Sequence, residues 1–368
     1  MKKKIVFTLP TLQGGGAEKV ISSIALNIDK KKYEVIIVVF DLSGQCYLKN
    51  KNKNKNIKII NLKSKKVSTG IFNFIKTIRR VNPDILISSI SHLNLFISLI
   101  KFFLPKKLKL VARESNFLSE NIKFQSNYFI MKILYKIFYD NLDQLIVFSQ
   151  KHKLDIIHNT NINYKKIKII ENPIDFNLIN KLSKKKIESK YNKFFSKKLT
   201  KFVYVGSLSF QKGLDIFIKS LALVEKENFI FNIIGSGSEK NNLKKLVRDK
   251  KLLKKINFIS FKKNPFPYIR MSDVFVMCSR FEGMSNTVLE ALSLDKSILY
   301  LDNTGASTDL LRKSKNSYPI KSNDPFFISK KINQYKKSDN KISNYNIIKK
   351  LRLNNILRKY EIVLDDLF

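Results

Sequence analysis

Residues 274–294 read VFVMCSRFEGMSNTVLEALSL, and this stretch gives the clearest indication of the fold class. Its first five residues are apolar and include β-branched and aromatic side chains, which predicts a buried strand over Val274–Cys278. Gly283 allows a tight turn, and Ser285 can cap the helix that the spacing of apolar residues predicts over Thr287–Leu294. A buried strand that passes through a glycine turn into a helix is the repeating unit of a parallel α/β fold.

The same alternation of short apolar runs and helical segments continues along the chain in both directions. We expect two doubly wound sheets of parallel strands rather than one very wide sheet. Strands are expected at 5–9, 35–40, 57–62, 85–88, 108–112, 144–148, 167–170, 202–206, 229–235, 256–260, 274–278 and 297–301. Helices are expected at 17–28, 70–80, 119–139, 213–224, 239–250, 287–294 and 346–368.

The segment Glu171-Asn172-Pro173 separates the two halves of the chain. Pro173 disfavours the helical conformation in the residue before it, so the chain is expected to turn here in extended form. We therefore expect a Rossmann-like N-terminal domain over 1–173 and a Rossmann-like C-terminal domain over 174–345. Residues 346–368 have helical spacing and no strand after them, which predicts a final helix.

Lys and Arg number 70 and Asp and Glu number 29, which gives a formal net charge of +41 in 368 residues. Such an excess attracts polyanions, although a compositional bias toward lysine explains it equally well. Two cysteines and three histidines exclude a disulfide scaffold and a cysteine-based zinc site. The start of the chain resembles a secretory leader but runs into Pro10 and a glycine triplet, so we expect a first strand and a cytosolic protein.

Gly14-Gly15-Gly16-Ala17-Glu18 follows the first expected strand and begins the first helix. Glycines let the backbone approach a ligand closely, and the N–H groups at a helix N-terminus bind anions. The stretch is not a dinucleotide fingerprint, because Lys19 stands where G-x-G-x-x-G requires its third glycine. It indicates a phosphate or sugar site, with a plain strand-to-helix turn as the alternative.

A similar arrangement recurs in the second half of the chain. The strand expected at 202–206 ends at Gly206, and Lys212 stands just before the next helix, where an ammonium group can neutralise a diphosphate. An ordinary surface lysine is the alternative in a chain this rich in lysine. Gly235 closes the following strand in the same way and is expected to shape the same site.

Two glutamates lie on either side of the Gly283 turn in residues 274–294. Glu282 precedes the helix and Glu290 lies inside it, so we expect their carboxylates at different levels of one pocket wall. An ionised carboxylate accepts hydrogen bonds from two neighbouring hydroxyl groups. The pair therefore fits a ligand that contains both a sugar ring and a ribose; two surface glutamates would be the ordinary interpretation in a more acidic protein.

Together these segments resemble the family 4 glycosyltransferases, which are retaining enzymes with the two-domain GT-B fold. The resemblance covers nearly the whole chain and rests on segments 14–18, 171–173, 205–213, 264–268 and 279–291. It implies two Rossmann-like domains that face a cleft, with the acceptor side in the first domain and the nucleotide sugar in the second. It also implies that the final helix crosses back to pack on the first domain.

The resemblance implies a role for each matching residue. Lys212 would pair with the diphosphate, Glu282 would hold the sugar hydroxyls, and both would act in catalysis, while Glu290 would hold the nucleotide ribose. The donor site would be completed by Gly15, Gly16, Gly206, Ser207, Gly235, Gly283, Met284, Ser285 and Asn286. The family commonly has arginine where this chain has Ser207, so one of two phosphate-binding cations is missing.

Candidate residues for the acceptor side follow two strands of the first half. His92 comes after the strand expected at 85–88, and Arg113 and Glu114 come after the strand expected at 108–112. We predict all three as acceptor-site residues and His92 as a further catalytic candidate. A buried structural histidine is an equal alternative for His92.

The resemblance predicts a metal-independent hexosyl- or N-acetylhexosaminyltransferase that needs no cofactor and uses a nucleoside-diphosphate sugar, such as a UDP-sugar, as co-substrate. The expected acceptor is a lipid-linked saccharide in surface polysaccharide or lipopolysaccharide biosynthesis.

We expect a peripheral protein on the inner face of the cell membrane, because the charge is basic and residues 117–139 mix large apolar side chains with lysines. A core helix is the alternative for that segment. The alternative function is a catalytically weakened GT-B scaffold that binds a membrane, a polyanion or nucleic acid, although nucleic acid is not expected because no recognised nucleic-acid module is found.

Overall fold

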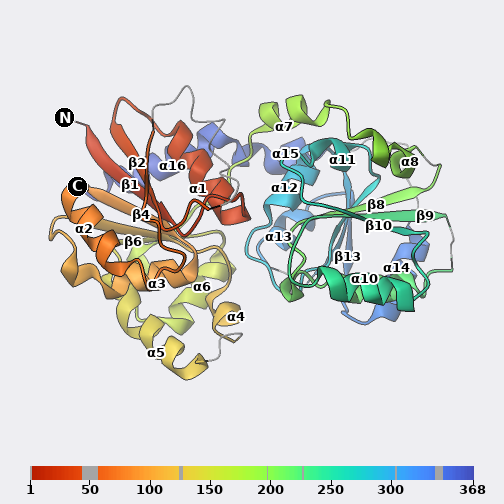
Figure 1. Cartoon of the computed structure of the whole chain (residues 1–368), viewed down its shortest axis with the longest axis horizontal. Coiled ribbons are helices and arrows are strands. Elements are labelled where there is room, and N and C mark those ends of the chain that lie inside the picture. The colour runs from red at the N-terminus through yellow and green to blue at the C-terminus, as the bar shows by residue number, and fades with distance from the viewer. Residues whose placement is uncertain are drawn as a thin grey trace. The chain divides into compact units, whose positions relative to one another are not determined.

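The computed structural model describes residues 2–43, 57–123, 127–196, 198–225, 228–302, 305–335 and 343–368. The chain forms two compact units, one containing Met1–Pro173 with Leu353–Phe368 and the other containing Ile174–Arg352 (Figure 1). The second change of unit comes at Leu353, later than the expected position 346. Helix α15 (Tyr345–Ile348) stays in the second unit because Ile348 is fully buried there.

The first unit is built on a seven-stranded parallel sheet with the strand order β3-β2-β1-β4-β5-β6-β7. In the central part, Ile5 of β1 pairs with Val35 on one side and with Ile85 on the other. Strands buried on both faces read as continuous apolar runs, which is the pattern of this sequence. The strands are β1 Lys3–Leu9, β2 Tyr33–Val39, β3 Lys58–Asn61, β4 Ile85–Ser89, β5 Lys109–Arg113, β6 Gln144–Val147 and β7 Ile167–Ile169.

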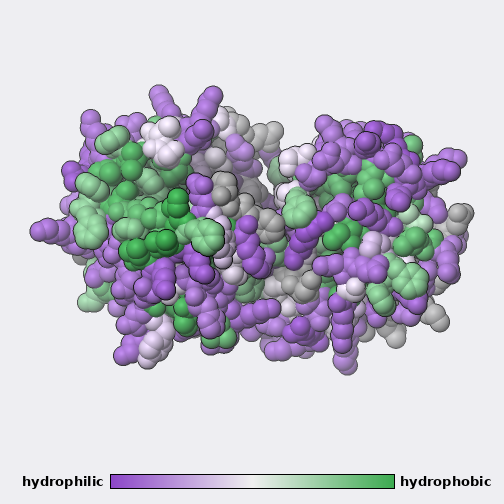
Figure 2. All heavy atoms as spheres, turned by 90° about the horizontal axis from the view of Figure 1, so that it is seen from below, coloured by the Kyte–Doolittle hydropathy of each residue, from purple (hydrophilic) through white to green (hydrophobic). Residues whose placement is uncertain are grey.

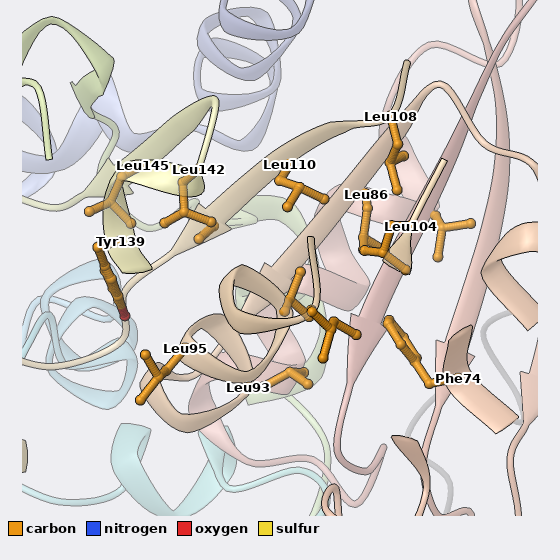
Figure 3. Close-up of a cluster of buried hydrophobic side chains, with 14 of the residues drawn as sticks. Phe74, Leu86, Leu93, Leu95, Leu104, Leu108, Leu110, Tyr139, Leu142 and Leu145 are labelled. Atoms are coloured by element: carbon orange, nitrogen blue, oxygen red, sulfur yellow. The ribbon is translucent and has the colours of Figure 1, made fainter. Parts of the chain in front are cut away.

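Helices cover both faces of this sheet. Helices α2, α3, α5 and α6 share one hydrophobic core with the strands, and Phe74, Leu93 and Leu110 lie within it (Figure 3). Helices α1 and α16 lie on the other side of the sheet (Figure 1). The helices are α1 Gly16–Asn27, α2 Ile71–Val81, α3 Ser91–Leu99, α4 Leu118–Lys123, α5 Tyr128–Phe138, α6 Gln150–Asn159 and α16 Leu353–Asp365.

The last helix, α16, returns to the first unit and packs there. The Tyr33 hydroxyl donates a hydrogen bond of 2.7 Å to Asp365, and the Lys359 ammonium group donates one of 2.7 Å to Glu171. Tyr360 is fully buried in the same helix. The expected return of the final helix to the first unit is confirmed.

The second unit repeats the plan with a six-stranded parallel sheet in the order β10-β9-β8-β11-β12-β13. Both sheets therefore run outward in two directions from their first strand, which is the Rossmann arrangement. The strands are β8 Thr200–Val205, β9 Phe229–Ile234, β10 Ile256–Ile259, β11 Val274–Met277, β12 Ser297–Leu301 and β13 Ser317–Ile320. The helices are α7 Phe176–Ser183, α8 Asn192–Phe195, α9 Leu214–Leu221, α10 Lys240–Asp249, α11 Phe266–Arg270, α12 Asn286–Ser293, α13 Ser307–Leu311, α14 Pro325–Gln334 and α15.

Several elements differ from the sequence prediction, which did not include the helices α6, α11, α13 and α14. Strand β13 was not predicted, because a four-residue edge strand that contains Pro319 lacks a long apolar run. The single helix expected over 119–139 is represented by α4 and α5, and residues 124–126 between them lie outside the described residues. Across the described residues, no helix combines the length and the apolar composition that a membrane span requires.

Candidate active site

In the second unit, the strand order reverses at β8, which lies between β9 and β11. The loops that follow β8 and β11 therefore leave the same edge of the sheet next to each other. Ligands of open α/β sheets bind at this point, outside the carboxyl ends of the strands. These two loops are the stretches 206–213 and 278–285, which the sequence analysis singled out.

The loop after β8 has a defined backbone. The Tyr204 hydroxyl donates a hydrogen bond of 2.7 Å to the carbonyl oxygen of Ser207. A short 3-10 helix, η5 (Phe210–Lys212), follows and ends at Gly213, whose φ is +63°. A Cβ atom at Gly213 would lie 2.1 Å from the carbonyl oxygen of Cys278. Glycine is therefore required for the two loops to approach this closely.

Arg280 joins the second loop to the first. Its N–H group donates a hydrogen bond of 2.7 Å to the carbonyl oxygen of Gln211. Its guanidinium group donates to both carboxylate oxygens of Asp215, at 2.9 and 2.7 Å, and lies 3.9 Å from the centre of the Phe210 ring. Burial raises the pKa of Asp215, but the hydrogen bonds and charge of Arg280 outweigh burial and lower it. A bidentate pair has a narrow geometry, so it keeps the loops at a defined spacing.

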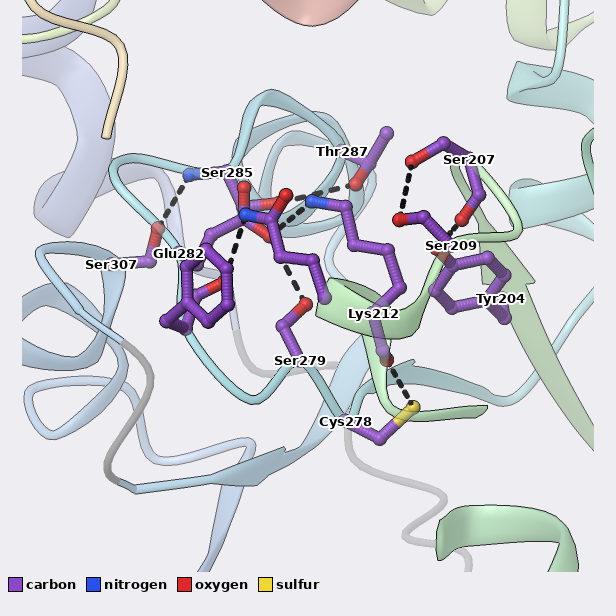
Figure 4. Close-up of polar contacts among 12 residues, drawn as sticks. Tyr204, Ser207, Ser209, Lys212, Cys278, Ser279, Glu282, Ser285, Thr287 and Ser307 are labelled. Atoms are coloured by element: carbon purple, nitrogen blue, oxygen red, sulfur yellow. Dashed lines mark hydrogen bonds and ion pairs between the residues drawn. The ribbon is translucent and has the colours of Figure 1, made fainter. Parts of the chain in front are cut away.

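Lys212 and Glu282 meet between these loops and form an ion pair (Figure 4). The Ser279 hydroxyl donates a hydrogen bond of 3.0 Å to the same carboxylate. The side chains of Lys212 and Glu282 are 17% and 11% exposed, so the pair is largely shielded from solvent. The structure thus brings together the two residues that the sequence predicts to be catalytic in this half of the chain.

A third segment, residues 305–307, packs against the start of α12. Ser285 occupies the N-cap position, but its side chain makes no capping hydrogen bond. Its N–H group donates a hydrogen bond of 2.9 Å to the Ser307 hydroxyl. At Gly305, where φ is +117°, a Cβ atom would lie 1.7 Å from the carbonyl oxygen of Glu282. The backbone around Glu282 is therefore supported from both sides.

The residues of the second unit that were also predicted for the donor site lie in or next to these loops and in α12. A Cβ atom at Gly235 would lie 1.9 Å from the carbonyl oxygen of Gly206, so these two strand ends are in close contact. Ser207 is exposed, whereas Glu290 is half-buried in α12. Gly283 and Met284 are buried, and Asn286 is the half-buried first residue of α12. Gly15 and Gly16 belong to the first unit.

The glycine loop of the first unit is occupied by a side chain of its own helix. The N–H groups of Gly14 and Gly15 donate hydrogen bonds of 2.6 and 2.8 Å to Glu18, and the Thr11 hydroxyl donates to its other oxygen. Glu18 is buried, at 7% exposure, so its carboxylate takes the place that an external anion would fill. In this structure the Gly15 N–H group donates to Glu18, and the donor-site role of Gly15 and Gly16 stays a prediction.

Glu114 was predicted to face the acceptor but is fully buried. It accepts hydrogen bonds from Ser91 at 2.5 Å and Asn94 at 2.7 Å, and a third from the Tyr139 hydroxyl. Burial raises the pKa of Glu114, although these hydrogen bonds oppose the shift. The carboxylate therefore connects β5 to α3 and the segment after α5, and the prediction of an acceptor contact is corrected.

Arg113 is also buried, at 2% exposure. It donates hydrogen bonds to the Ser89 hydroxyl at 3.3 Å and to Asn172, and its guanidinium group lies 4.7 Å from the centre of the Phe148 ring. Burial lowers the pKa of Arg113. The end of β5 is enclosed by neighbouring segments, and for this reason the predicted exposure of Arg113 to an acceptor is wrong.

His92 is exposed in the first turn of α3. Ile90, two residues earlier, has a φ of +85°, which is rare for a β-branched residue. Such strain persists where the surrounding structure enforces it, and it accumulates at functional sites. Of the three predicted acceptor residues, His92 is the one that remains available to a ligand.

Sequence reasoning missed four side chains that organise these loops: Glu18, Asp215, Ser279 and Arg280. The signal for Glu18 was present, since a carboxylate three residues after the N-cap is the capping-box spacing. Arg280 and Asp215 are 65 positions apart, and no local pattern predicts their pairing. In the described parts of both units, no group of three or more His, Cys, Asp or Glu residues is arranged to hold a metal ion.

Comparison with known proteins agrees with this description. Residues 14–178 match the family model Glycosyltransferase Family 4, and residues 185–352 match the model Glycosyl transferases group 1. The two matched ranges span nearly all of the chain, which therefore belongs to the glycosyltransferases of the family 4 type. Its fold is the GT-B fold.

Two curated relatives illustrate the resemblance. An uncharacterized glycosyltransferase, MJ1059 of Methanocaldococcus jannaschii, is 29% identical over 70% of this chain and 66% of that protein. The N-acetylgalactosamine-N,N'-diacetylbacillosaminyl-diphospho-undecaprenol 4-alpha-N-acetylgalactosaminyltransferase of Campylobacter jejuni is 25% identical over 84% of this chain and 83% of its own length.

Among solved structures, Anabaena Alr3699/HepE in complex with UDP and glucose is similar, with a TM-score of 0.81 and 17% sequence identity. That similarity covers 99% of this chain and 100% of the Anabaena chain. At this level of identity, the comparison establishes the shared fold.

Proposed function

We propose that this protein is a retaining glycosyltransferase that moves a sugar from a nucleoside-diphosphate sugar to a lipid-linked saccharide. The observation that carries the proposal is the ion pair between Lys212 and Glu282 at the carboxyl edge of the second sheet. A cation and a hydroxyl-binding carboxylate side by side match the two parts of a nucleotide sugar that adjoin the reacting bond.

When the donor binds, Lys212 and Glu282 separate and each takes a part of the donor as its new partner. The diphosphate takes the place of Glu282 beside the Lys212 ammonium group, and the released carboxylate accepts hydrogen bonds from the sugar hydroxyls. Ser279 keeps Glu282 in position during the exchange through its 3.0 Å hydrogen bond. Glu290 binds the ribose from α12. Gly15 and Gly16 of the first unit stay predicted donor contacts, although the Gly15 N–H group donates to Glu18 in this structure.

The chemical step breaks the bond between the anomeric carbon and the diphosphate oxygen, and the acceptor hydroxyl oxygen attacks from the same face of the sugar. The hydroxyl proton passes to the departing diphosphate. Negative charge develops on the departing diphosphate, where Lys212 stabilises it. Electrostatic stabilisation of this kind contributes on the order of several kcal/mol. We propose that the reaction needs no metal ion, so transfer should continue unchanged in a chelator.

The acceptor assignment is supported by relatives whose names specify undecaprenol-linked acceptors, one of them a glycosyltransferase 24% identical over 89% of this chain. We assign acceptor binding to the first unit, with His92 as the contacting residue, and donor binding to the second unit.

The transferred group is a hexose or an N-acetylhexosamine, and the product belongs to surface polysaccharide biosynthesis. The enzyme acts as a peripheral protein on the inner face of the membrane.

Titration with a panel of UDP-, GDP- and ADP-sugars tests this function. The wild-type protein should bind one class saturably, and Lys212→Ala and Glu290→Ala should lose that binding. Lys245→Ala is the matched control, because Lys245 is an exposed lysine on α10 of the same unit. Binding to DNA or RNA without binding to any nucleotide sugar would instead support the polyanion-binding alternative.

A further inference from the structure

The outward face of α5 carries large apolar side chains in contact with solvent. Phe129, Ile130, Ile133 and Ile137 are 78%, 59%, 56% and 57% exposed. Three of them are spaced four residues apart and therefore form one stripe along the helix. Figure 2 shows an apolar patch on the first unit, on the side where α5 lies in Figure 1. Contiguous apolar surface on a folded protein marks an interaction site.

These side chains do not contribute to the core of the unit. The opposite face of α5 does so, because Tyr135 is fully buried and Met131, Leu134 and Phe138 pack against the hydrophobic core. The helix is thus anchored by one face while the other remains uncovered. Phe102 and Phe103 lie in the short 3-10 helix η1 (Lys101–Phe103), which follows the neighbouring helix α3, and they add aromatic side chains that are 79% and 58% exposed.

The charge around the stripe identifies the kind of partner. Lys132 and Lys136 are exposed and lie one turn apart on the same helix. The whole chain has a formal net charge of +41. Apolar side chains with lysines beside them are typical of helices that lie in a membrane interface, where the lysines meet anionic headgroups.

We propose that α5 is the membrane-binding element of this protein and that Phe129, Ile130, Ile133 and Ile137 insert among the headgroups of an anionic bilayer. The proposal rests on the proposed function, since a lipid-linked acceptor requires the enzyme to reach a bilayer. A second copy of the chain is a less favourable occupant of this face. Such an interface would bring together two lysine-bearing helices of strongly basic molecules, which repel each other.

Flotation of the full-length protein with lipid vesicles tests the proposal. We expect binding to phosphatidylcholine vesicles that contain phosphatidylglycerol, little binding to pure phosphatidylcholine, and weaker binding as salt is raised. The double variant Ile133→Ser, Ile137→Ser should reduce partition by roughly tenfold or more. The double variant Lys132→Gln, Lys136→Gln should reduce it by roughly fivefold per lysine and weaken the salt dependence.

Ile362→Ser is the matched control. Ile362 is 55% exposed on α16, on the other side of the same sheet, so this variant makes the same chemical change away from α5. It should bind vesicles as the wild type does. All variants change exposed residues, and circular dichroism should give the wild-type spectrum for each.

Three results would overturn the proposal: equal binding to neutral and anionic vesicles, unchanged binding of both α5 variants, or dimerisation that the Ile133→Ser, Ile137→Ser variant abolishes in the absence of lipid. Binding of nucleotide sugars is measured on the same samples. If vesicle binding fails while a nucleotide sugar binds, the membrane proposal alone is wrong. If vesicles bind and no nucleotide sugar does, the proposed function is the part that fails.

Discussion

The ammonium group of Lys212 and the carboxylate of Glu282 are ion-pair partners, although 70 positions of sequence separate them. Lys212 ends the loop after β8, and Glu282 lies in the loop after β11. Because β8 and β11 are neighbours in the sheet, the two loops begin side by side. The pair is therefore a product of the strand order rather than of any local sequence pattern.

Replacement of Lys212 should affect catalysis far more than folding. Lys212→Met removes the cation proposed to stabilise the departing diphosphate, and we expect kcat to fall by about 10²–10³-fold. Ser279→Ala removes only a hydrogen bond that positions Glu282, and a smaller loss, roughly tenfold, is expected. Steady-state kinetics with the sugar identified by titration measures both. A wild-type rate for Lys212→Met would contradict the proposed role.

The capping of α1 by Glu18 gives a prediction about stability. Glu18→Ala leaves the N–H groups of Gly14 and Gly15 without their acceptor at a buried helix start. We expect a loss of about 1–2 kcal/mol in the free energy of unfolding. Glu18→Gln retains an acceptor oxygen and should lose less. Urea denaturation provides the comparison, and equal stability of the two variants would count against the capping role.

Gly213 and Gly15 should respond differently to replacement by alanine. Gly213, which was not among the predicted site residues, ends η5 with φ +63° and has no room for a Cβ atom beside Cys278, so Gly213→Ala should lower the free energy of unfolding by about 2 kcal/mol or more. Gly15 has φ −58°, and the nearest atom to its Cβ position, in the Glu18 side chain, is 3.5 Å away. Gly15→Ala should therefore stay within about 0.5 kcal/mol of the wild type. Thermal unfolding of both variants decides between these outcomes.

His152 makes the first unit sensitive to acid. The residue is fully buried on α6, with the rings of Phe117 and Phe148 each centred 5.0 Å from its own, and burial lowers its pKa to about 3. Below a pH of about 6.5 the unfolded chain binds a proton that the folded chain excludes. The free energy of unfolding should therefore fall as pH falls from about 6.5 toward 3, by up to ~1.4 kcal/mol per pH unit.

The measurement is urea denaturation at a series of pH values. His152→Leu should flatten the pH dependence in this range. His158→Leu alters an exposed histidine on the same helix and serves as the control, which should keep the wild-type slope. An identical slope in all three proteins would show that the buried imidazole is not the source of the acid sensitivity.

The expected strands and helices match the structure where the signal is local. Continuous apolar runs predict buried central strands such as β1 and β11, and the glycine residues after these strands predict the turns. The edge strand β13 was not predicted, because it has only four residues and Pro319 interrupts its apolar run. The sequence predicted that residues 117–139 form either a membrane-surface helix or a core helix. It did not predict the exposed stripe on α5, because apolar composition does not reveal which face of a helix packs inward.

The candidate site was predictable in its residue types but not in their partners. Lys212 and Glu282 were identified from glycine turns that follow strands, and the structure brings them together. Arg113 and Glu114 follow a strand in the same way, yet both side chains are buried in polar networks. The position after a strand is a local property, whereas access to a ligand depends on which segments cover that strand end.

Local sequence patterns were enough to predict two Rossmann-like units, the position at which the second unit begins, and the loops to which we assign the donor site. These features follow from apolar periodicity, glycine and proline, which act on the backbone within a few residues. Three other features follow from the three-dimensional fold: Glu282 binds Lys212, Glu18 binds the glycine loop, and Arg113 is enclosed. Each of those contacts joins groups placed by the order of strands in a sheet or by the closing of a loop, and short-range preferences do not contain that information.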